Sequence, residues 1–574
     1  MNLDLSIIPF SARYSYMAIC ELPENHGGTG CDAGLFLKTV RGAARDMLVC
    51  ALLPLYDGEP VEYTYEATPS ELVISHEYGA VRICFASDGI ILFKGEGENT
   101  GLRFMEVPET SGFKYIHEVR YEGKTHHMVN VPKSRSRYLA HAIEGEIAVE
   151  QNWAIKSSGF CVMDYLAANG GFLCVLEEVF PEWGQKKYAF DYIERVNTVK
   201  SDFEAFYNSM PETPAEYEEA RKLAAYINWS AYVRKSGEFK RDGMLMSKNW
   251  MPGVWSWDHC FNAIALSYNN PGLAWDQFML VFDLQDKSGS VPDCINDAYS
   301  TSNFCKPPIH GWTLFKLAER MELSAEQCAE AYDRLGRHTS WWLKYRDGDG
   351  DGICEYWHGN DSGWDNSTAF SVIPPLELPD LAAYLVIQMD ALAWLAEKLN
   401  LPDGAAEWKR KADKMLENMA NHCYKDGVPL ALQSGTHIES GNDSLLMYMP
   451  VVLGKRLPEH ILKHTLDVLK SGRFLTEHGY ATESPQSKHY RPNGYWQGPI
   501  WAPSTMLIVD GLIESGEKGL AGEVARKFCE MVKKSGCAEN YDALAGEGLC
   551  DRAYTWTASV FLILANFLNS IPAF

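Results

Sequence analysis

The pattern of hydrophobic and polar positions changes once along this chain, near residue 200. Before that point, short segments alternate between apolar and polar residues, with turn signals such as Ser87-Asp88-Gly89 between them. Alternation with a period of two predicts half-buried strands, and several short strands in succession predict an antiparallel β-sandwich. We expect strands at 34–37, 61–65, 72–75, 80–85 and 89–93.

After residue 200 the pattern becomes helical. Thr213-Pro214-Ala215-Glu216 and Ser324-Ala325-Glu326-Gln327 are typical of helix starts, with an N-cap hydroxyl and an acid or amide three residues on. We expect further helices over 381–399, 405–422, 459–470, 504–514, 521–534 and 555–569, and one from 325 to about 342.

These predicted helices fall into two kinds. Those at 381–399 and 555–569 are apolar nearly all round, which is typical of buried helices, whereas 405–422 and 521–534 are amphipathic. Buried and amphipathic helices together favour two concentric layers, as in an α/α barrel. A helical solenoid is the alternative, although no fixed-period repeat supports it. We therefore expect a β-sandwich domain over 1–205 and a mainly α domain over 206–574.

Composition and charge exclude several classes of protein. The net charge of −24 over 574 residues argues against a nucleic-acid or anionic-membrane partner, because no basic patch offsets it. Fifteen scattered cysteines without a Cys-x-x-Cys pair predict reduced thiols rather than disulfides or zinc. The sequence shows neither a signal peptide nor an apolar run of the ~18 residues that a membrane span needs. A cytoplasmic protein is the expectation.

Long loops between the predicted helices combine aromatic residues with carboxylates and amides. Examples are 250–258, 357–364 and 491–501. Aromatic rings stack on the apolar face of a pyranose while polar groups bond its hydroxyls, so these loops predict a sugar pocket. Within them, Trp364 directly precedes Asp365. An apolar wall raises the pKa of a carboxylic acid, as a general acid requires, although Asp and Asn also form ordinary turns.

Hydrolysis of a glycosidic bond needs a second carboxyl group on the opposite side of the bond. The carboxylates in polar loops are Asp258, Asp361, Asp365, Glu483, Glu539 and Glu547. Glu539 is favoured because Cys537-Ala538-Glu539-Asn540-Tyr541-Asp542 connects two predicted helices, as the loop of Asp365 does. If both loops lie at one end of a barrel, the two residues face each other across its mouth.

Several of these stretches, taken together and in order, resemble the inverting α-glycosidases of glycoside hydrolase family 63 and the related trehalases of family 37. The matching stretches cover roughly residues 210–574 and are Trp257-Asp258-x-x-Phe261, Gln285 with Gly289-x-Val291-Pro292, Ser362 to Ser367, Arg491 to Trp501, Glu539-Asn540-Tyr541 and Tyr554-Thr555-Trp556-Thr557. The resemblance implies an (α/α)6 barrel behind an N-terminal antiparallel β-sandwich. It also implies that Asp365 is the general acid and Glu539 the general base, with about 6.5–9.5 Å between their carboxyl groups.

The same resemblance implies a subsite for the non-reducing sugar. Its lining residues would be Trp257, Asp258, Gln285, Tyr495, Trp496 and Trp501, and Trp364 beside the acid is expected to bind substrate as well. The sequence departs from the family pattern at Gln497, where an Arg is usual. The loss of that cation leaves the sugar and the linkage open.

An acidic loop precedes the stretch that carries Asp365. In Asp347-Gly348-Asp349-Gly350-Asp351-Gly352-Ile353-Cys354-Glu355 the acids stand at positions 1, 3, 5 and 9, a spacing that can wrap a hard cation. Position 12 is His358 rather than Glu, so the loop is not an EF-hand. Some members of the resembled family bind Ca²⁺ at such a loop, with the carbonyl of the residue at Ile353 contributing. Two interpretations of this loop remain. It is either a solvated acidic turn or the site of a structural Ca²⁺ held by Asp347, Asp349, Asp351, Ile353 and Glu355.

The sequence thus predicts an inverting, exo-acting α-glycosidase, with an α-glucosidase for short oligosaccharides or glucosides as the first expectation. No cofactor is expected for the chemistry itself. An inverting phosphorylase and a non-catalytic sugar-binding protein are the alternatives. Glu539 argues against the phosphorylase, because a carboxylate repels phosphate.

Overall fold

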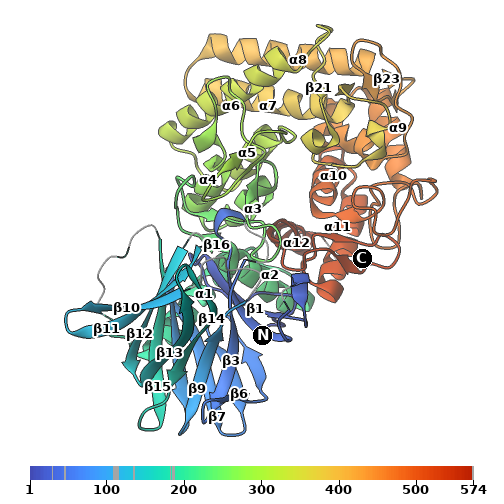
Figure 1. The fold of residues 1–574 in the computed structure, drawn as a ribbon. Helices are drawn as coiled ribbons and strands as arrows, with labels where there is room; N and C mark the ends of the chain where they lie inside the picture. Colours follow the sequence, from blue (N-terminus) through green and yellow to red (C-terminus); the bar gives the residue numbers. More distant parts are fainter. Residues whose placement is uncertain are drawn as a thin grey trace.

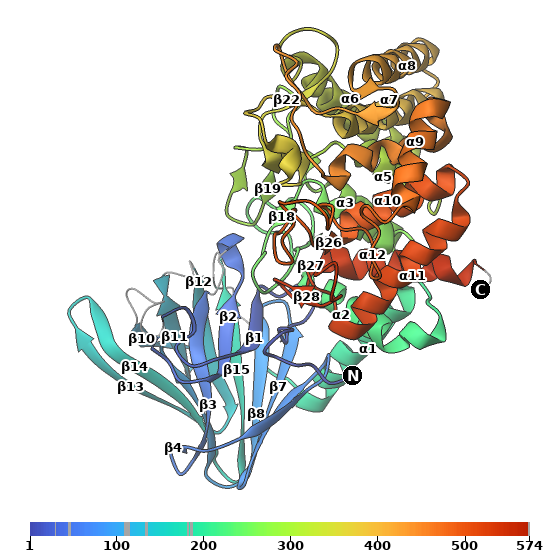
Figure 2. The same ribbon diagram turned by 90° about the vertical axis from the view of Figure 1, so that its right-hand side faces the viewer.

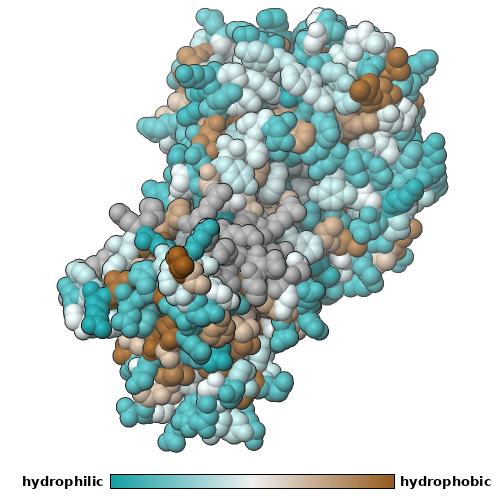
Figure 3. All heavy atoms as spheres, in the orientation of Figure 1, coloured by the Kyte–Doolittle hydropathy of each residue, from teal (hydrophilic) through white to brown (hydrophobic). Residues whose placement is uncertain are grey.

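The computed structural model describes residues 1–28, 30–43, 47–107, 115–132, 136–180, 183 and 188–571. An N-terminal β-sandwich lies beside a larger ring of helices, and the two remain separate layers when the molecule is turned by 90° (Figures 1 and 2). None of the described helices combines the length with the apolar run that crossing a membrane requires. On the face seen in Figure 3, hydrophilic residues predominate over the helical part, and more hydrophobic residues show on the sandwich.

The sandwich consists of two antiparallel sheets. In the described residues, one sheet has the order β1 (Met17–Leu22), β2 (Gly34–Thr39), β3 (Leu48–Tyr56), β9 (Thr100–Met105), β14 (Ser157–Leu166), β13 (Glu146–Ala154), with β4 (Glu59–Pro60) beside β3. The other has the order β10 (Tyr115–Tyr121), β11 (Lys124–Val131), β12 (Ser136–Glu144), β15 (Gly171–Val179), β8 (Ile90–Glu96), β7 (Gly79–Ser87), β6 (Leu72–His76), β5 (Thr64–Ala67). The antiparallel sandwich expected from the alternating pattern is confirmed.

The helical part is a closed double ring. In residues 218–569, all of which the structure describes, inner and outer helices alternate along the chain. The inner helices are α3 (Asp258–Leu266), α5 (His310–Ala318), α7 (Pro379–Lys398), η9 (Leu445–Arg456), α10 (Ala502–Glu514) and α12 (Thr555–Asn569). The outer helices are α2 (Glu218–Ala231), α4 (Pro271–Met279), α6 (Ala325–Tyr345), α8 (Pro402–His422), α9 (Glu459–Lys470) and α11 (Lys518–Ser535).

Each inner helix packs against the next, and α12 packs against α3, which closes the ring. This arrangement is the (α/α)6 barrel, and a solenoid is excluded because a solenoid does not close. The apolar helices at 379–398 and 555–569 lie inside, and the amphipathic helices at 402–422 and 518–535 lie outside, as their patterns predict.

Two boundaries differ from the expectations. Helix α1 (Tyr192–Ser209) runs across residue 205, the expected edge of the domains. The helix expected from Thr213 begins as a 3-10 turn at Ala215–Tyr217, and α2 starts at Glu218. No side-chain hydrogen bond caps this turn at Pro214, so the N-cap hydrogen bond expected from Thr213 does not form.

Candidate active site

The polar and aromatic loops meet at one end of the barrel because each of them leads into the first turn of an inner helix. Trp257 directly precedes α3, Trp501 precedes α10 and Tyr554 precedes α12. The loop of Asp365 leads to α7, and that of Glu539 leads to α12. Inner helices run in the same direction, so all these loops lie at the end where inner helices begin. The motifs are hundreds of residues apart in sequence and share one mouth in space.

The loop of Asp365 is held by a buried ion pair. The carboxylate of Asp361 is 1% exposed; it accepts hydrogen bonds from Arg346 at 2.8 Å and from the backbone N–H groups of Cys305 and Trp357 at 3.0 and 2.9 Å. Gly363 follows with φ of 73°, and a Cβ there would lie 2.6 Å from the indole of Trp257. Only glycine fits both constraints. Asp361 is therefore a structural anchor, and Asp365 is the carboxylate left facing open space.

The surroundings of Asp365 suit a general acid. Its side chain is 33% exposed, and burial raises its pKa above the usual aspartate value. The ammonium group of Lys306 lies 4.0 Å from Oδ1 of Asp365 and acts against this rise. A raised pKa keeps a fraction of the carboxyl groups protonated nearer neutral pH, as proton donation requires.

Glu539 is positioned by a small sheet made of loop strands. β26 (Ile500–Trp501), β27 (Asn540–Tyr541) and β28 (Gly548–Leu549) pair antiparallel, with Trp501 opposite Asn540. The carboxylate of Glu539 is 6% exposed and accepts a hydrogen bond of 3.1 Å from the Tyr495 hydroxyl. The backbone N–H of Glu539 donates to the carbonyl of Asp551 at 2.7 Å.

Tyr495 connects the two carboxylates electrostatically. It adopts φ of 61°, an unusual conformation for a bulky residue and one that clusters at functional sites. Burial raises the pKa of its phenol far above the usual range, and the nearby charges of Glu539 and Asp365 add to the effect. The hydroxyl therefore stays protonated and remains a donor to Glu539.

Beside Asp365 and Tyr495 lies a cavity with about 340 Å³ of free space, counted to its mouth. Glu539 is absent from its lining and stands one hydrogen bond behind Tyr495. Its lining residues are Met251, Trp255, Trp257, Asp258, Lys306, Gly363, Asp365, Tyr495, Trp496, Trp501, Tyr554 and Trp556. We call it the aromatic cavity. Trp496 and Trp501 stack in parallel with centroids 4.1 Å apart, and Trp364 packs behind Trp496 at 4.6 Å. Asp258 is 3% exposed at the cavity wall, with the hydroxyl of Tyr554 3.5 Å from its Oδ1.

A second cavity opens on the other side of Asp365. We call it the polar cavity; it has about 740 Å³ of free space. Its lining residues are His358, Gly359, Asp365, Asn366, Ser367, Thr368, Phe370, Ser371, Pro374, His489 and Gln497. Asp365 is the residue common to both linings. The amide of Gln497 donates to the backbone carbonyl of Asn366 at 2.8 Å, so it ties this loop to that of Asp365.

Not every expected residue reaches the aromatic cavity. The amide of Gln285 donates to the backbone carbonyls of Gly289 and Arg334 at 2.9 and 3.0 Å, so it joins a loop to α6 and is absent from the lining. Trp364 lies one layer behind the wall. Glu483 is fully buried and accepts from Thr368 and Ser487, both at 2.6 Å, while Glu547 is exposed.

Lys306 is a site residue that the sequence motifs do not reveal. It is 5% exposed, its Nζ lies 3.1 Å from Asp293, and it donates to the carbonyl of Asn360 at 2.8 Å. No local pattern marks this lysine in Phe304-Cys305-Lys306-Pro307-Pro308. Its partners come from loops more than ten residues away on either side, and only the fold brings them together.

The acidic loop brings three carboxylates together. Ligand oxygens of Asp347, Asp349 and Asp351 lie within 4.8 Å of one another. Hard oxygen donors at this spacing fit Ca²⁺. Glu355 stands outside this group, because its Oε1 accepts from the indole of Trp357 at 2.8 Å, and the side chain of Ile353 is buried. Nε2 of His437 lies 3.1 Å from Oδ2 of Asp349.

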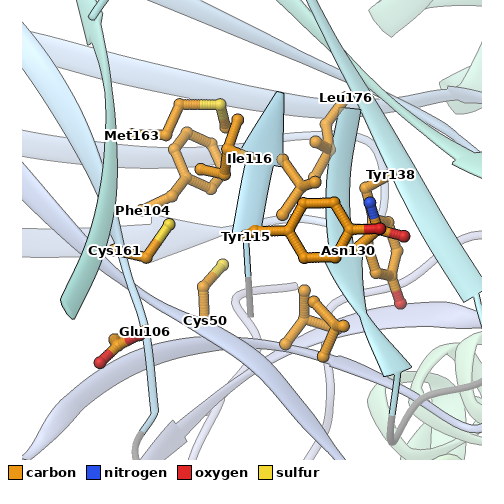
Figure 4. A pocket seen from close by; sticks show the side chains of 13 residues that line it. Cys50, Phe104, Glu106, Tyr115, Ile116, Asn130, Tyr138, Cys161, Met163 and Leu176 are labelled. Atoms are coloured by element: carbon orange, nitrogen blue, oxygen red, sulfur yellow. The ribbon is translucent and has the colours of Figure 1, made fainter. Parts of the chain in front are cut away.

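The sandwich contains a third cavity, shown in Figure 4. Its walls are almost entirely apolar and come from both sheets, with Tyr115 and Asn130 on β10 and β11. Among the described residues that line it, Glu106 supplies the single carboxylate. A reaction that needs two opposed carboxyl groups therefore has no place there.

Comparison with known proteins places the barrel in a known group. The sequence profile described as the mannosylglycerate hydrolase MGH1-like glycoside hydrolase domain matches residues 251–557, more than half of the chain. The chain is 22% identical over 398 residues to mannosylglycerate hydrolase MGH1 of Selaginella moellendorffii, covering 55% of this chain and 81% of that protein. It is 23% identical over 407 residues to a glucosylglycerate hydrolase of Mycolicibacterium hassiacum, covering 54% of this chain and 91% of that one.

Two solved structures share the fold. A family 63 mannosylglycerate hydrolase from Thermus thermophilus, in complex with Tris, has a TM-score of 0.53 at 17% identity and covers 60% of this chain and 98% of its own. A bacterial glucoamylase in complex with acarbose has a TM-score of 0.63 at 12% identity and covers 99% of this chain and 94% of its own. The second likeness includes the sandwich, so the two-part fold and the resemblance to family 63 are confirmed.

Proposed function

Because the chain belongs to the mannosylglycerate hydrolase MGH1-like family of glycoside hydrolases, we propose that it hydrolyses a small α-glycoside with inversion at the anomeric carbon. Asp365 protonates the leaving oxygen, and Glu539 takes a proton from the attacking water. The observation that carries this assignment is the position of Asp365 on the border of two cavities, with Glu539 bonded to the aromatic wall of one of them.

In this proposal each of the two cavities binds a different part of the substrate. The non-reducing sugar stacks in the aromatic cavity, and the leaving group occupies the polar cavity, so the scissile oxygen lies beside Asp365. Tyr495 donates to Oε1 of Glu539 and so orients the carboxylate that activates the water. Inversion needs room for that water, and this requires about 6.5–9.5 Å between the carboxyl groups. The narrow aromatic cavity favours a single terminal sugar and thus exo action.

The leaving group is small and hydroxylated in this proposal. The polar cavity offers amide, hydroxyl and imidazole groups, and Gln497 adds no charge where the family pattern has Arg. Relatives are named as hydrolases of mannosylglycerate and glucosylglycerate. We propose an α-hexoside of glycerate or of a short sugar chain as the substrate, with glucose as the first candidate hexose.

A phosphorylase is disfavoured by the charges at the site. Asp258 and Asp365 line the aromatic cavity, and Glu539 lies 3.1 Å from the hydroxyl of Tyr495 in its wall. The ammonium of Lys306 is already paired with Asp293 at 3.1 Å. A phosphate dianion would enter against this net negative charge.

The test is an activity panel on the full chain. Glucosylglycerate, mannosylglycerate and α-linked glucose disaccharides are incubated with and without phosphate, and free hexose and hexose 1-phosphate are measured. We expect free hexose independent of phosphate. Asp365→Asn and Glu539→Gln should each lower kcat by roughly 10²–10⁴-fold, whereas the exposed control Glu547→Gln should not. Formation of hexose 1-phosphate, or full activity in Asp365→Asn, would overturn the proposal.

A further inference from the structure

A large cavity lies between the sandwich and the barrel, and its lining shares no residue with the aromatic and polar cavities described above. It has about 1380 Å³ of free space counted to its open mouth. Residues 5–7, 20–23, 26, 33 and 38 of the sandwich form one side, and 249–250 with 550–552 form the other. We call it the interdomain cavity.

Lys38 is the unusual group in this cavity. On β2, Leu35 and Leu37 point into the sandwich core, so Phe36 and Lys38 face the other way, toward the barrel. Lys38 is 3% exposed, yet its Nζ makes one hydrogen bond, to the carbonyl of Asn249 at 3.3 Å. Among the described residues, no carboxylate lies within ion-pair distance of it. A buried ammonium without a counter-ion is costly unless a ligand supplies the charge.

The carboxylates that line the cavity, those of Asp551 and Glu21, accept hydrogen bonds from neutral groups. Asp551 accepts from Ser247 at 2.5 Å, from Asn249 at 3.3 Å and from the backbone N–H groups of Trp250 and Ala553 at 3.1 and 3.0 Å. Glu21 accepts from the hydroxyl of Tyr65 at 2.6 Å. On the same wall as Asp551, the buried Nε of Arg552 has no hydrogen-bond partner among the described residues.

An exposed aromatic face completes the cavity. The indole of Trp250 is 46% exposed on the wall that carries Asn249. An indole face beside polar groups suits a hydroxylated ring or chain, whose C–H groups stack on it. The cavity therefore combines a buried ammonium that has no ion pair among the described residues with an exposed indole.

We propose that the interdomain cavity binds a small anionic sugar derivative, with its phosphate or carboxylate on Lys38 and its body against Trp250. This ligand is distinct from the glycoside that is hydrolysed. Binding is coupled to catalysis through Asp551, whose side chain holds the backbone of Trp250 and whose carbonyl holds the backbone N–H of Glu539. That coupling rests on the proposed role of Glu539, whereas the binding site itself does not.

Calorimetric titration of the full chain tests the binding site. Glucose 6-phosphate, gluconate and glucose serve as the phosphate, carboxylate and neutral probes. We expect one phosphate- or carboxylate-dependent site, and Lys38→Met should weaken it by about tenfold or more, since a charge-assisted hydrogen bond is lost. The exposed control Lys463→Met should bind as the wild type does. Equal binding of glucose and the anionic probes, or an unchanged affinity in Lys38→Met, would refute the site.

Hydrogen exchange on the wild-type protein gives an answer that needs no variant. Glucose 6-phosphate should protect backbone amides at 36–38, 249–251 and 550–553. Absence of protection there, or protection confined to 364–367 and 494–498, would show that the cavity is not the site.

For the coupling, kcat is measured with and without glucose 6-phosphate in the wild type and in Lys38→Met. A change in kcat that appears in the wild type alone supports the coupling. If glucose 6-phosphate binds and kcat stays unchanged, the proposed coupling is wrong, whereas the proposed binding site is still supported.

Discussion

At the scale of single residues, the chemistry depends on how one carboxyl group is balanced between opposing influences. Burial raises the pKa of Asp365, the charge of Asp293 raises it further, and the ammonium of Lys306 lowers it. The pKa of Lys306 is itself raised, because Asp293, Asp365 and Asp258 outweigh its burial. Lys306 therefore stays charged and acts as a positioning residue that limits how far the pKa of Asp365 rises.

This balance predicts the effect of Lys306→Met on the pH profile. The general acid is active when protonated, so kcat falls as the pH rises through the pKa of Asp365 in the substrate complex. Removing the ammonium raises that pKa, and the basic limb of kcat should move to higher pH by about one unit. The profile of kcat from acidic to alkaline pH measures this shift.

Lys316→Met is the matched control for that variant. Lys316 is also a buried lysine, paired with Asp510 at 2.7 Å, but it lies on α5 away from both cavities of the site. Its loss should destabilise the fold to a similar extent and leave the basic limb in place. An unmoved limb in Lys306→Met, or equal shifts in both variants, would contradict the assigned role.

At the scale of elements, the acidic loop 347–355 connects α6 to the short strand that precedes Asp365, so its conformation affects the position of that strand. The loop joins α6 to β21 (Glu355–Tyr356), from which the chain continues into η7 (Gly359–Ser362) and Asp365. Burial and the charges of Asp351 and Asp349 raise the pKa of Asp347, because three carboxylates crowd one place. A Ca²⁺ ion there would relieve this repulsion, and we propose that it stabilises the loop without entering the chemistry.

Calcium should therefore raise the melting temperature of chelator-treated protein. Binding at a hundred times Kd corresponds to about 2.7 kcal/mol, which raises the melting temperature of a chain of this size by about 2 °C. Scanning calorimetry with EDTA, then with Ca²⁺ or Mg²⁺, measures the shift. Asp347→Asn should reduce the calcium effect, and the exposed Asp403→Asn should not. An identical melting temperature with chelator and with calcium would remove the ion from the account.

The elements also show how far the sequence determines this structure. Helices α7, α8 and α12 follow from their apolar periodicity, and the capping box at Ser324 forms as expected. Helix α1 is not predicted, although it has 18 residues. The nine-residue helices α3, α4 and α5 carry too few turns for a clear period. η9 is not predicted either, since Pro450 within it breaks the helical pattern.

Prediction of the site from the sequence is also limited to what neighbouring residues show. Trp364 beside Asp365 predicts an acid in an aromatic loop from adjacent residues. The places of Asp258 and of the aromatic wall follow from the resemblance to family 63. Lys306 and Gln285 depend on partners from distant loops or from α6, so nothing in their local sequence tells which of them reaches the cavity. The structure places Lys306 there and Gln285 elsewhere.

At the scale of the whole molecule, buried histidines make the free energy of unfolding of the barrel depend on pH. His259 and His310 on inner helices and His338 on the outer helix α6 are each at most 1% exposed. The ring centroid of His310 lies 5.3 Å from those of the other two. Burial lowers the pKa of His259 to about 4 and that of His338 to about 3. These imidazoles are neutral in the folded protein, and they charge on unfolding below their ordinary pKa near 6.5.

The barrel should therefore lose stability as the pH falls from about 6.5 toward 4, because the unfolded chain then binds more protons than the folded one. A depression from 6.5 to about 4 corresponds to roughly 3 kcal/mol for His259 alone. Denaturant melts at several pH values measure the slope. His338→Gln keeps an acceptor for the indole of Trp342 and should flatten the slope, whereas the exposed control His460→Gln should not. A stability that is level over this range would contradict the assignment.

The proposed position of Asp365 and Glu539 on opposite sides of one sugar is tested most directly by the anomer that is released first. Proton NMR of the earliest product from an α-linked substrate of the panel distinguishes the two outcomes within one spectrum. The β-anomer of the free hexose should appear first and then mutarotate, since water attacks from the face opposite the leaving group. The α-anomer appearing first would mean retention, and the two carboxylates could not then work through a single water.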